Sequence, residues 1–232
     1  MIIEVLYPNL CNLFGDRGNV VYLKKCLPES TFIETGIDDE PYFNKHHVDL
    51  IYMGPTSEKG QMIVKEKLEP YKDKINELII EGTVFFLTGN AMEVFGKQVV
   101  DKDGTIFNGL GLLDINSNRD MINRKNSIFL GKYKNLEIVG FQSQFTTCTT
   151  SEEKIFEKVY GIGLNDSDNF AGIKKNNLIA TPLIGPLLVL NPLFTKLALR
   201  MDKLTFESDL MKAYEVRLQE YKNIINKQWK NK

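Results

Sequence analysis

Short apolar segments alternate with helix-like segments through the first hundred residues, and this alternation is the strongest constraint on the fold. Four segments have the length and composition of buried strands, at residues 2–7, 31–36, 48–54 and 83–89. Segments typical of helices lie between them at 19–27 and 61–82, and a further helix is expected to begin near Met92. Pro70 should break the longer helix or start a second one. This alternation favours a parallel sheet with helices on both faces.

The pattern changes after residue 97, where turns rich in Gly and Asn separate shorter strand-like segments. These segments lie at residues 105–115, 127–133, 136–145 and 178–185. We expect them to be antiparallel or mixed and to extend one edge of the sheet. Near the C-terminus, apolar residues recur at the spacing of one helix face, at Leu210, Tyr214, Leu218, Tyr221 and Ile225. Because the chain has no repeat and no convincing linker, we expect one domain over residues 1–232.

Charge and cysteine content exclude several classes of function. The 232 residues contain 29 Lys and Arg against 30 Asp and Glu, for a net charge of −1. This balance gives no basis for nucleic acid or an anionic membrane as the main partner. The three cysteines are widely spaced and form no CxxC pair, so we expect no disulfide framework, no metal site and no cofactor. The N-terminus resembles no secretion signal and no segment is long and apolar, which predicts a cytoplasmic protein without membrane insertion.

The turn after the fourth expected strand has the outline of a nucleophile turn. Many enzymes place a nucleophile between a strand and a helix in this way. Here the turn offers Thr88, Gly89 and Asn90, with neither Cys nor Ser. The two histidines, His46 and His47, come just before the third strand. Sites in parallel sheets form at the opposite, carboxyl ends of the strands, so we interpret both histidines as surface loop residues.

Two loops should face a cleft at the carboxyl ends of the first and third strands. In the first, residues 15–19 read GDRGN. Asp16 or Asn19 could cap the helix that follows, or the loop could line the cleft, and the residues alone allow both interpretations. The second loop, residues 53–60, could donate backbone N–H groups to an oxyanion, although Pro55 has no N–H to donate. The chain contains no phosphate-binding loop and no dinucleotide fingerprint.

Six segments, taken in order along the chain, carry a resemblance to a known family. They are residues 6–24, 49–61, 82–96, 109–115, 138–147 and 176–192. Together they resemble the class I glutamine amidotransferases of the cobyric acid synthase type, and in particular the glutaminase subunits of bacterial lipid II isoglutaminyl synthases. The first and last segments are the most specific. The resemblance implies a flavodoxin-like α/β fold with a mixed, mostly parallel sheet and helices on both faces.

The chain departs from the family at the residues of the site. The family's nucleophilic Cys falls on Gly89, and its catalytic His falls on Ile184. Gly54 matches the first glycine of the oxyanion loop, whereas the next glycine is replaced by Pro55. The polar segment that follows the Gly-Phe pair is changed as well, to Gln142, Ser143 and Gln144. Glutamine hydrolysis in the family proceeds through a thioester on Cys with His moving the protons, so the resemblance implies a degenerate pocket without glutaminase activity.

The resemblance also implies a role in peptidoglycan metabolism beside a Mur-ligase-like, ATP-dependent amidating partner. Asp16, Arg17 and Asn19 keep the family's first loop, either as an interface or because the fold needs it. Two alternatives stay open. The chain could be an active amidotransferase component with Thr88 or Cys148 as its nucleophile, although neither has a visible base. It could instead be a sensor whose pocket holds glutamine or another small molecule without chemistry.

Overall fold

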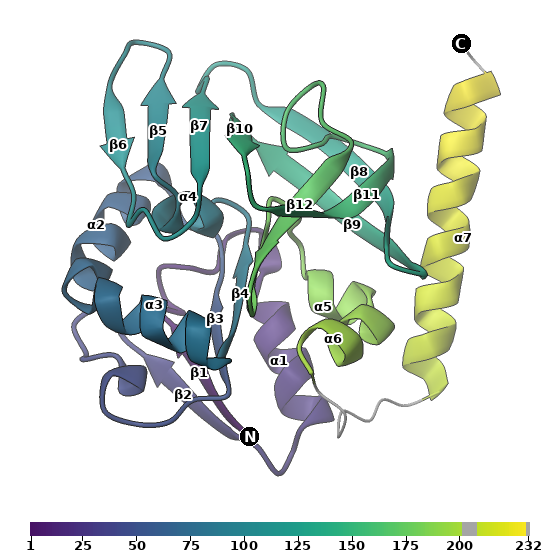
Figure 1. Cartoon of the computed structure of the whole chain (residues 1–232). Coiled ribbons are helices and arrows are strands. Elements are labelled where there is room, and N and C mark those ends of the chain that lie inside the picture. Colours follow the sequence, from purple (N-terminus) through teal and green to yellow (C-terminus); the bar gives the residue numbers. More distant parts are fainter. Residues whose placement is uncertain (201–207, 231–232) are drawn as a thin grey trace.

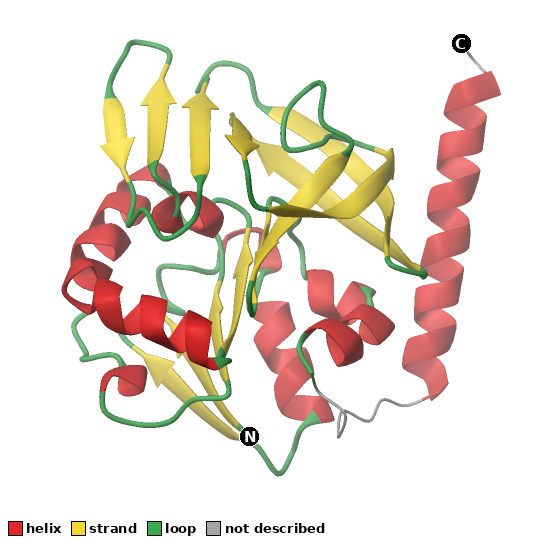
Figure 2. Cartoon of the chain, viewed as in Figure 1, coloured by secondary structure: helices red, strands yellow, loops and turns green. Residues whose placement is uncertain are grey.

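The computed structural model describes residues 1–200 and 208–230, which form two sheets with helices packed around the larger one (Figure 1). The larger sheet has nine strands in the order β2-β1-β3-β4-β13-β12-β11-β8-β9, and the smaller has four in the order β10-β7-β5-β6. Figure 2 shows both sheets in yellow and the helices in red.

The elements have the following bounds. The larger sheet contains β1 (Ile2–Leu6), β2 (Thr31–Thr35), β3 (Leu50–Met53), β4 (Val84–Thr88), β8 (Lys125–Tyr133), β9 (Leu136–Gln144), β11 (Glu153–Tyr160), β12 (Phe170–Lys175) and β13 (Leu178–Thr181). The smaller contains β5 (Gln98–Asp101), β6 (Ile106–Asn108), β7 (Ile115–Arg119) and β10 (Thr146–Thr150). The α-helices are α1 (Arg17–Cys26), α2 (Glu58–Leu68), α3 (Lys72–Glu81), α4 (Ala91–Phe95), α5 (Leu187–Leu190), α6 (Pro192–Ala198) and α7 (Ser208–Lys230). Short 3₁₀ turns lie at Leu13–Gly15, Tyr42–Asn44 and Glu69–Tyr71.

The first half of the larger sheet is parallel, as the strand–helix alternation predicts. Strands β2, β1, β3, β4 and β13 pair in parallel, and β13, β12, β11, β8 and β9 continue the sheet with antiparallel pairings. The mixed α/β fold is therefore confirmed. The order of the first four strands reverses direction between β1 and β3, and clefts in open sheets form at such a switch point. The loops after β1 and β3 meet there.

Alternate residues of the parallel strands feed two separate cores. On one face, Ile51 and Phe85 pack with α2 and α3 through apolar residues such as Val64 and Ile75. On the other face, strand residues such as Phe86 pack with α1, α5 and α6. Helices on both faces were expected, and the break at Pro70 is confirmed because a 3₁₀ turn separates α2 from α3 there.

The C-terminal helix α7 lies against β8 and β9, at the far end of the larger sheet (Figure 1). The predicted apolar face is confirmed: Tyr221 and Ile225 are buried against Leu130 and Val139, and Leu218 packs beside them. No helix in residues 1–200 or 208–230 is both long and apolar enough to cross a membrane.

The expectation that the segments after residue 97 extend one edge of the sheet is confirmed for residues 127–133, 136–145 and 178–185, which lie in the larger sheet, and is wrong for residues 105–115. Strands β5, β6, β7 and β10 form the separate smaller sheet. The physical reason is that β13 pairs with β4 and occupies the edge that these strands would need. Within the segment 105–115, only Ile106–Asn108 and the final residue are in strands. Leu110, Leu112 and Leu113 instead fill the core from a loop.

Candidate functional site: a pocket above the turn after β4

The turn after β4 has the backbone of a nucleophile turn. Gly89 follows the buried strand directly and has φ +57°, a left-handed value that costs a residue with a side chain about 1–2 kcal/mol. Helix α4 begins two residues later. The strand–turn–helix geometry expected from the sequence is therefore present, with glycine at its apex.

Two other residues occupy the space in which a side chain of Gly89 would lie. A Cβ atom built on Gly89 would be 2.7 Å from Cβ of Pro55 and 3.0 Å from Cγ2 of Ile184. The Ile184 side chain is buried, and its N–H donates to the carbonyl of Phe141 over 2.9 Å, which fixes the residue in place. Pro55 and Ile184 thus both border the space beside Gly89.

The loop after β3 has little capacity to bind an oxyanion. Pro55 has no N–H, and the N–H of Thr56 donates to Oδ1 of Asn90 over 2.9 Å. The Asn90 amide in turn donates to the carbonyl of Thr56 over 2.7 Å. Asn90 therefore pairs with the backbone of Thr56 as a neighbouring strand would, and it ties the β3 loop to the β4 turn.

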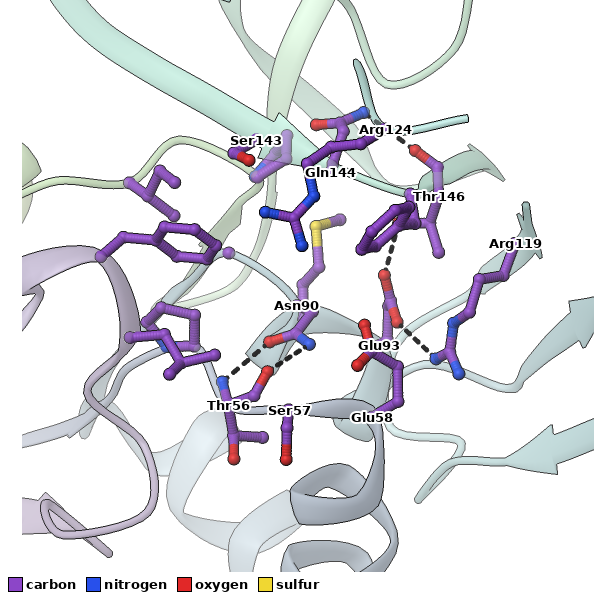
Figure 3. Close-up of a pocket in the computed structure, with 18 residues that line it drawn as sticks. Thr56, Ser57, Glu58, Asn90, Glu93, Arg119, Arg124, Ser143, Gln144 and Thr146 are labelled. Atoms are coloured by element: carbon purple, nitrogen blue, oxygen red, sulfur yellow. Dashed lines mark hydrogen bonds and ion pairs between the residues drawn. The ribbon is translucent and has the colours of Figure 1, made fainter. Parts of the chain in front are cut away.

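A pocket of about 250 Å³ opens above this turn, at the carboxyl ends of the parallel strands. Its floor includes Gly89, Pro55, Met92 and Ile184. Figure 3 shows its polar walls, with Thr56, Ser57 and Glu58 below, Glu93 and Arg119 on one side, and Arg124, Ser143 and Gln144 above. The pocket lies where ligand sites of open α/β sheets usually form.

A closed network of charges supports one wall of the pocket. Glu93 and Arg119 are both buried, and Nη2 of Arg119 lies 3.1 Å from Oε2 of Glu93. Gln61 donates to Glu93 over 2.8 Å, and the hydroxyl of Thr146 donates to its other oxygen over 2.6 Å. Arg119 also donates to Oε1 of Gln61 over 2.7 Å. Because these groups satisfy one another, they hold α2, α4, β7 and β10 together and leave little hydrogen-bonding capacity for a ligand.

Two opposite charges in the pocket are not used in this way. Arg124 stacks its guanidinium on the ring of Phe145, 4.3 Å from the centroid, and it extends into the pocket (Figure 3). Glu58 lines the pocket from the first turn of α2. Within the described part of the chain, neither side chain forms an ion pair or a hydrogen bond with another residue.

A second polar cluster lies beneath the turn. Asp16 is fully buried and accepts hydrogen bonds from Tyr52, from Thr88 over 2.9 Å and from Asn19 over 3.1 Å. Asn19 also accepts from the N–H of Leu188 over 2.7 Å. Burial raises the pKa of Asp16 to about 6, against the lowering effect of these hydrogen bonds.

This network explains the GDRGN loop. Asp16 does not cap α1 through its side chain, so the capping interpretation is wrong, and the carboxylate instead joins the loop to β3 and β4. Gly54 is needed in the same place, because a Cβ there would lie 2.3 Å from Oδ2 of Asp16. The Arg17 side chain is exposed, and its guanidinium lies 3.7 Å from the Glu34 carboxylate. Asp16 and Asn19 are buried and cannot contact a partner directly.

The remaining candidate residues divide between the pocket and its surroundings. Thr88 is buried and directs its hydroxyl to Asp16, away from the pocket. Gln142 is buried and accepts from the N–H of Ile162 over 3.1 Å, so it too lies outside the pocket, whereas Gln144 lines it. Cys148 is buried, and burial raises the pKa of its thiol to about 12, which makes it a poor nucleophile. The sequence pattern therefore locates the turn and its loops correctly but does not separate pocket residues from supporting ones.

Several pocket residues carry no signal in the sequence. Arg119 and Arg124 come from β7 and from the segment after it, far from the turn in sequence, and no motif connects them to it. Glu58 and Glu93 sit on helices whose spacing indicates only an amphipathic face. The histidines, by contrast, are exposed before β3, as expected.

No protein-family model matches the chain. Two curated proteins have sequences similar to that of this chain. The chain is 26% identical over 237 residues to the lipid II isoglutaminyl synthase (glutamine-hydrolyzing) subunit GatD of Streptococcus pneumoniae, covering 96% of this chain and 86% of that protein. It is 27% identical over 184 residues to the subunit of the same name from Staphylococcus aureus, covering 78% of this chain and 75% of that protein. The chain is homologous to GatD.

Among solved structures, a glutamine amidotransferase of Thermotoga maritima superposes with a TM-score of 0.55 at 8% sequence identity, covering 97% of this chain and 94% of that chain. This likeness concerns the fold, and it agrees with the mixed α/β architecture. The similarity to GatD bears out the resemblance to the glutaminase subunits of lipid II isoglutaminyl synthases, and the structural likeness bears out the mixed α/β fold.

Proposed function

We propose that this chain is a catalytically degenerate, glutaminase-like subunit that acts beside an amidating enzyme of cell-wall precursor metabolism. One observation carries the proposal: Pro55 and Ile184 close the space beside Gly89, where a nucleophile, an oxyanion loop and a base would be needed. Glutamine hydrolysis through a thioester requires a thiolate and a proton carrier. Glycine supplies no nucleophile, and isoleucine cannot carry a proton.

The loop after β3 supports the same conclusion independently. An oxyanion hole needs N–H donors directed at the reacting carbonyl, and each donor is typically worth 10²–10³ in rate. Pro55 has no donor, and the donor of Thr56 is used by Asn90. A fold that retained the site for catalysis would keep these groups free.

Homology to GatD supports a role in the amidation of lipid II, because both relatives are named as subunits of a lipid II isoglutaminyl synthase. We propose that the partner is a Mur-ligase-like, ATP-dependent enzyme that this subunit stabilises or regulates, and that both work in the cytoplasm. Such a partner would draw on free ammonia. Arg17 is a candidate contact, because its side chain is exposed whereas the side chains of Asp16 and Asn19 are buried.

The test is an assay of glutamate and ammonia release from glutamine, with the purified chain alone and in complex with its ligase partner. We expect no release above the uncatalysed background in either case. Turnover by the unmodified chain would overturn the proposal. The triple variant Gly89→Cys, Pro55→Gly and Ile184→His serves as a positive comparison, since it restores the missing groups and the space for them.

The alternative of an active enzyme with a rearranged site has weaker support. Thr88 is buried and bonded to Asp16, and Cys148 is buried with a raised thiol pKa. Neither lines the pocket. The variants Thr88→Val and Cys148→Ala separate the two proposals: turnover that disappears in either variant would favour the rearranged site.

A further inference from the structure

The pocket above Gly89 combines one unpaired cation and one unpaired anion. Arg124 enters it from the segment between β7 and β8, and Glu58 enters it from α2. Figure 3 shows them on opposite sides of the pocket. No ion pair joins them in the described residues, although ion pairs are common elsewhere on this chain. The space between them is therefore suited to a ligand that carries both a carboxylate and an ammonium group.

The floor between these charges is apolar. Gly89, Pro55, Met92 and Ile184 line it. Two polar side chains of the pocket, Asn90 and Glu93, are already used: both ends of the Asn90 side chain bond to Thr56, and both oxygens of Glu93 accept hydrogen bonds. A ligand side chain that reached this floor would lose its water without gaining polar partners.

The size of the pocket limits the ligand further. At about 250 Å³ it falls below the roughly 300–1,000 Å³ typical of pockets for drug-sized molecules. A single amino acid is of the right scale, and it has both charges within a few bonds of each other. Arg124 is stiffened by its stack on Phe145, which lowers the entropic cost of binding a carboxylate.

We propose that this pocket binds a single amino acid with an apolar side chain and discriminates against glutamine. Arg124 receives the carboxylate, Glu58 receives the ammonium group, and the floor formed by Gly89, Pro55 and Ile184 receives the side chain. The proposal rests on the proposed loss of hydrolysis, because the same three residues that remove the chemistry create the apolar floor.

Methionine and glutamine provide a matched pair of ligands, because both side chains are unbranched and similar in length. The carboxamide of glutamine would be buried on the apolar floor without partners, whereas the thioether of methionine needs none. In isothermal titration calorimetry with the whole chain, we expect methionine or leucine to bind at least about tenfold more tightly than glutamine. Methionine methyl ester lacks the carboxylate and N-acetylmethionine lacks the ammonium group, so both should bind weakly.

Substitutions test the two charges separately. Arg124→Gln and Glu58→Gln should each weaken methionine binding by about tenfold or more, since each leaves one ligand charge unpaired. Lys125→Gln is the matched control: Lys125 is next to Arg124, pairs with Asp166 and does not line the pocket, so methionine affinity should be unchanged. Thermal unfolding of each variant checks that it is folded before its affinity is compared.

Three outcomes would overturn the proposal: glutamine binding as tightly as methionine, no amino acid binding at millimolar concentrations, or Arg124→Gln leaving methionine affinity unchanged. An ammonia assay on the same glutamine samples keeps this proposal separate from the proposed function. Release of ammonia would contradict the proposed loss of hydrolysis. The ratio of the affinities for methionine and glutamine tests separately whether the pocket prefers an apolar side chain.

Discussion

The two sides of the β4 turn have opposite chemical character. Beneath it, Asp16, Asn19, Tyr52 and Thr88 form a buried network in which each group has a partner. Above it, Pro55 and Ile184 border Gly89, at positions where we propose that the groups needed for hydrolysis are absent. The lower side connects the loop after β1 with β3, β4 and the start of α5 through polar groups, whereas the residues beside Gly89 on the upper side are apolar. The proposed loss of chemistry above the turn would therefore leave the polar network beneath it intact.

This difference also shows why a retained motif does not by itself indicate activity. The GDRGN loop looks like a functional signature, yet its two buried polar residues connect β1, β3, β4 and α5. Replacing a buried, paired polar group leaves its partners unsatisfied, which costs about 1–3 kcal/mol for each group. The requirements of the fold therefore explain why Asp16 and Asn19 are present in the loop. They do not explain Arg17, whose side chain is exposed.

The largest expected effect comes from crowding the lower side. In Gly54→Ala the new methyl group would lie 2.3 Å from Oδ2 of Asp16 and 2.5 Å from the carbonyl oxygen of Cys11, and that backbone atom cannot move without shifting the β1 loop. We expect the free energy of unfolding to fall by about 3 kcal/mol. Urea denaturation measures it.

The control for this variant is Gly15→Ala. Gly15 has φ +73° and no atom near its Cβ position, so it loses only the glycine conformation, which costs about 1 kcal/mol. Equal losses in the two variants would show that contact with Asp16 does not matter at Gly54.

Restoring a side chain above the turn should cost less. Gly89→Cys brings Cβ within 2.7 Å of Pro55 and 3.0 Å of Ile184 at a left-handed φ, and we expect a loss of about 2 kcal/mol in unfolding free energy. Adding Pro55→Gly should recover part of the loss by removing the closer contact. Gly104→Cys is the control variant. Gly104 also has a positive φ, and no atom lies near its Cβ position, so this variant measures the cost of the left-handed backbone alone. If Gly89→Cys is no more destabilised than Gly104→Cys, the space beside Gly89 is not closed.

How far the sequence predicted this molecule depends on whether the interactions are local. The strands before residue 97 and the turn at Gly89 follow from apolar runs and turn residues, which are local signals, and they are confirmed. The smaller sheet was missed because the choice between β13 and β5 as a neighbour of β4 is made by long-range pairing. No periodicity of residues 98–119 indicates that choice.

The same reasoning applies to the site. Gly89, Pro55 and Ile184 could be aligned from family motifs, but their mutual contact depends on the tertiary fold. Thr88 and Gln142 each precede a pocket residue in sequence, yet Thr88 donates to Asp16 beneath the turn and Gln142 accepts from Ile162, and neither lines the pocket. Arg124 depends on how the segment after β7 crosses the sheet, which no local pattern in the sequence specifies.

The lower network should also respond to pH. The ordinary pKa of the Asp16 carboxyl is 3.8, and burial raises it to about 6. Between these two pKa values, Asp16 keeps its proton in the folded chain and loses it in the unfolded chain. The contribution of this proton to stability is complete below the lower pKa and is lost as pH rises through the higher one. Lowering the pH from about 7 to about 5 should stabilise the chain by about 1 kcal/mol relative to Asp16→Asn, measured by urea denaturation of both proteins. A difference that stays constant with pH would place the titration elsewhere.

The smallest expected effect concerns Arg17, the exposed end of the same motif. Its guanidinium lies 3.7 Å from Glu34 with 54% of the Arg17 side chain exposed, whereas Lys24 lies 2.7 Å from the same carboxylate. Exposed ion pairs contribute about 0–1 kcal/mol, so Arg17→Ala should change the unfolding free energy by less than about 0.5 kcal/mol. In double-mutant cycles, the coupling of Arg17 to Glu34 should be smaller than that of Lys24 to Glu34. A loss above about 1 kcal/mol would mean that Arg17 supports the loop as its buried neighbours do. A near-zero loss makes Arg17→Ala a variant that can test the proposed partner contact without disturbing the network beneath the turn.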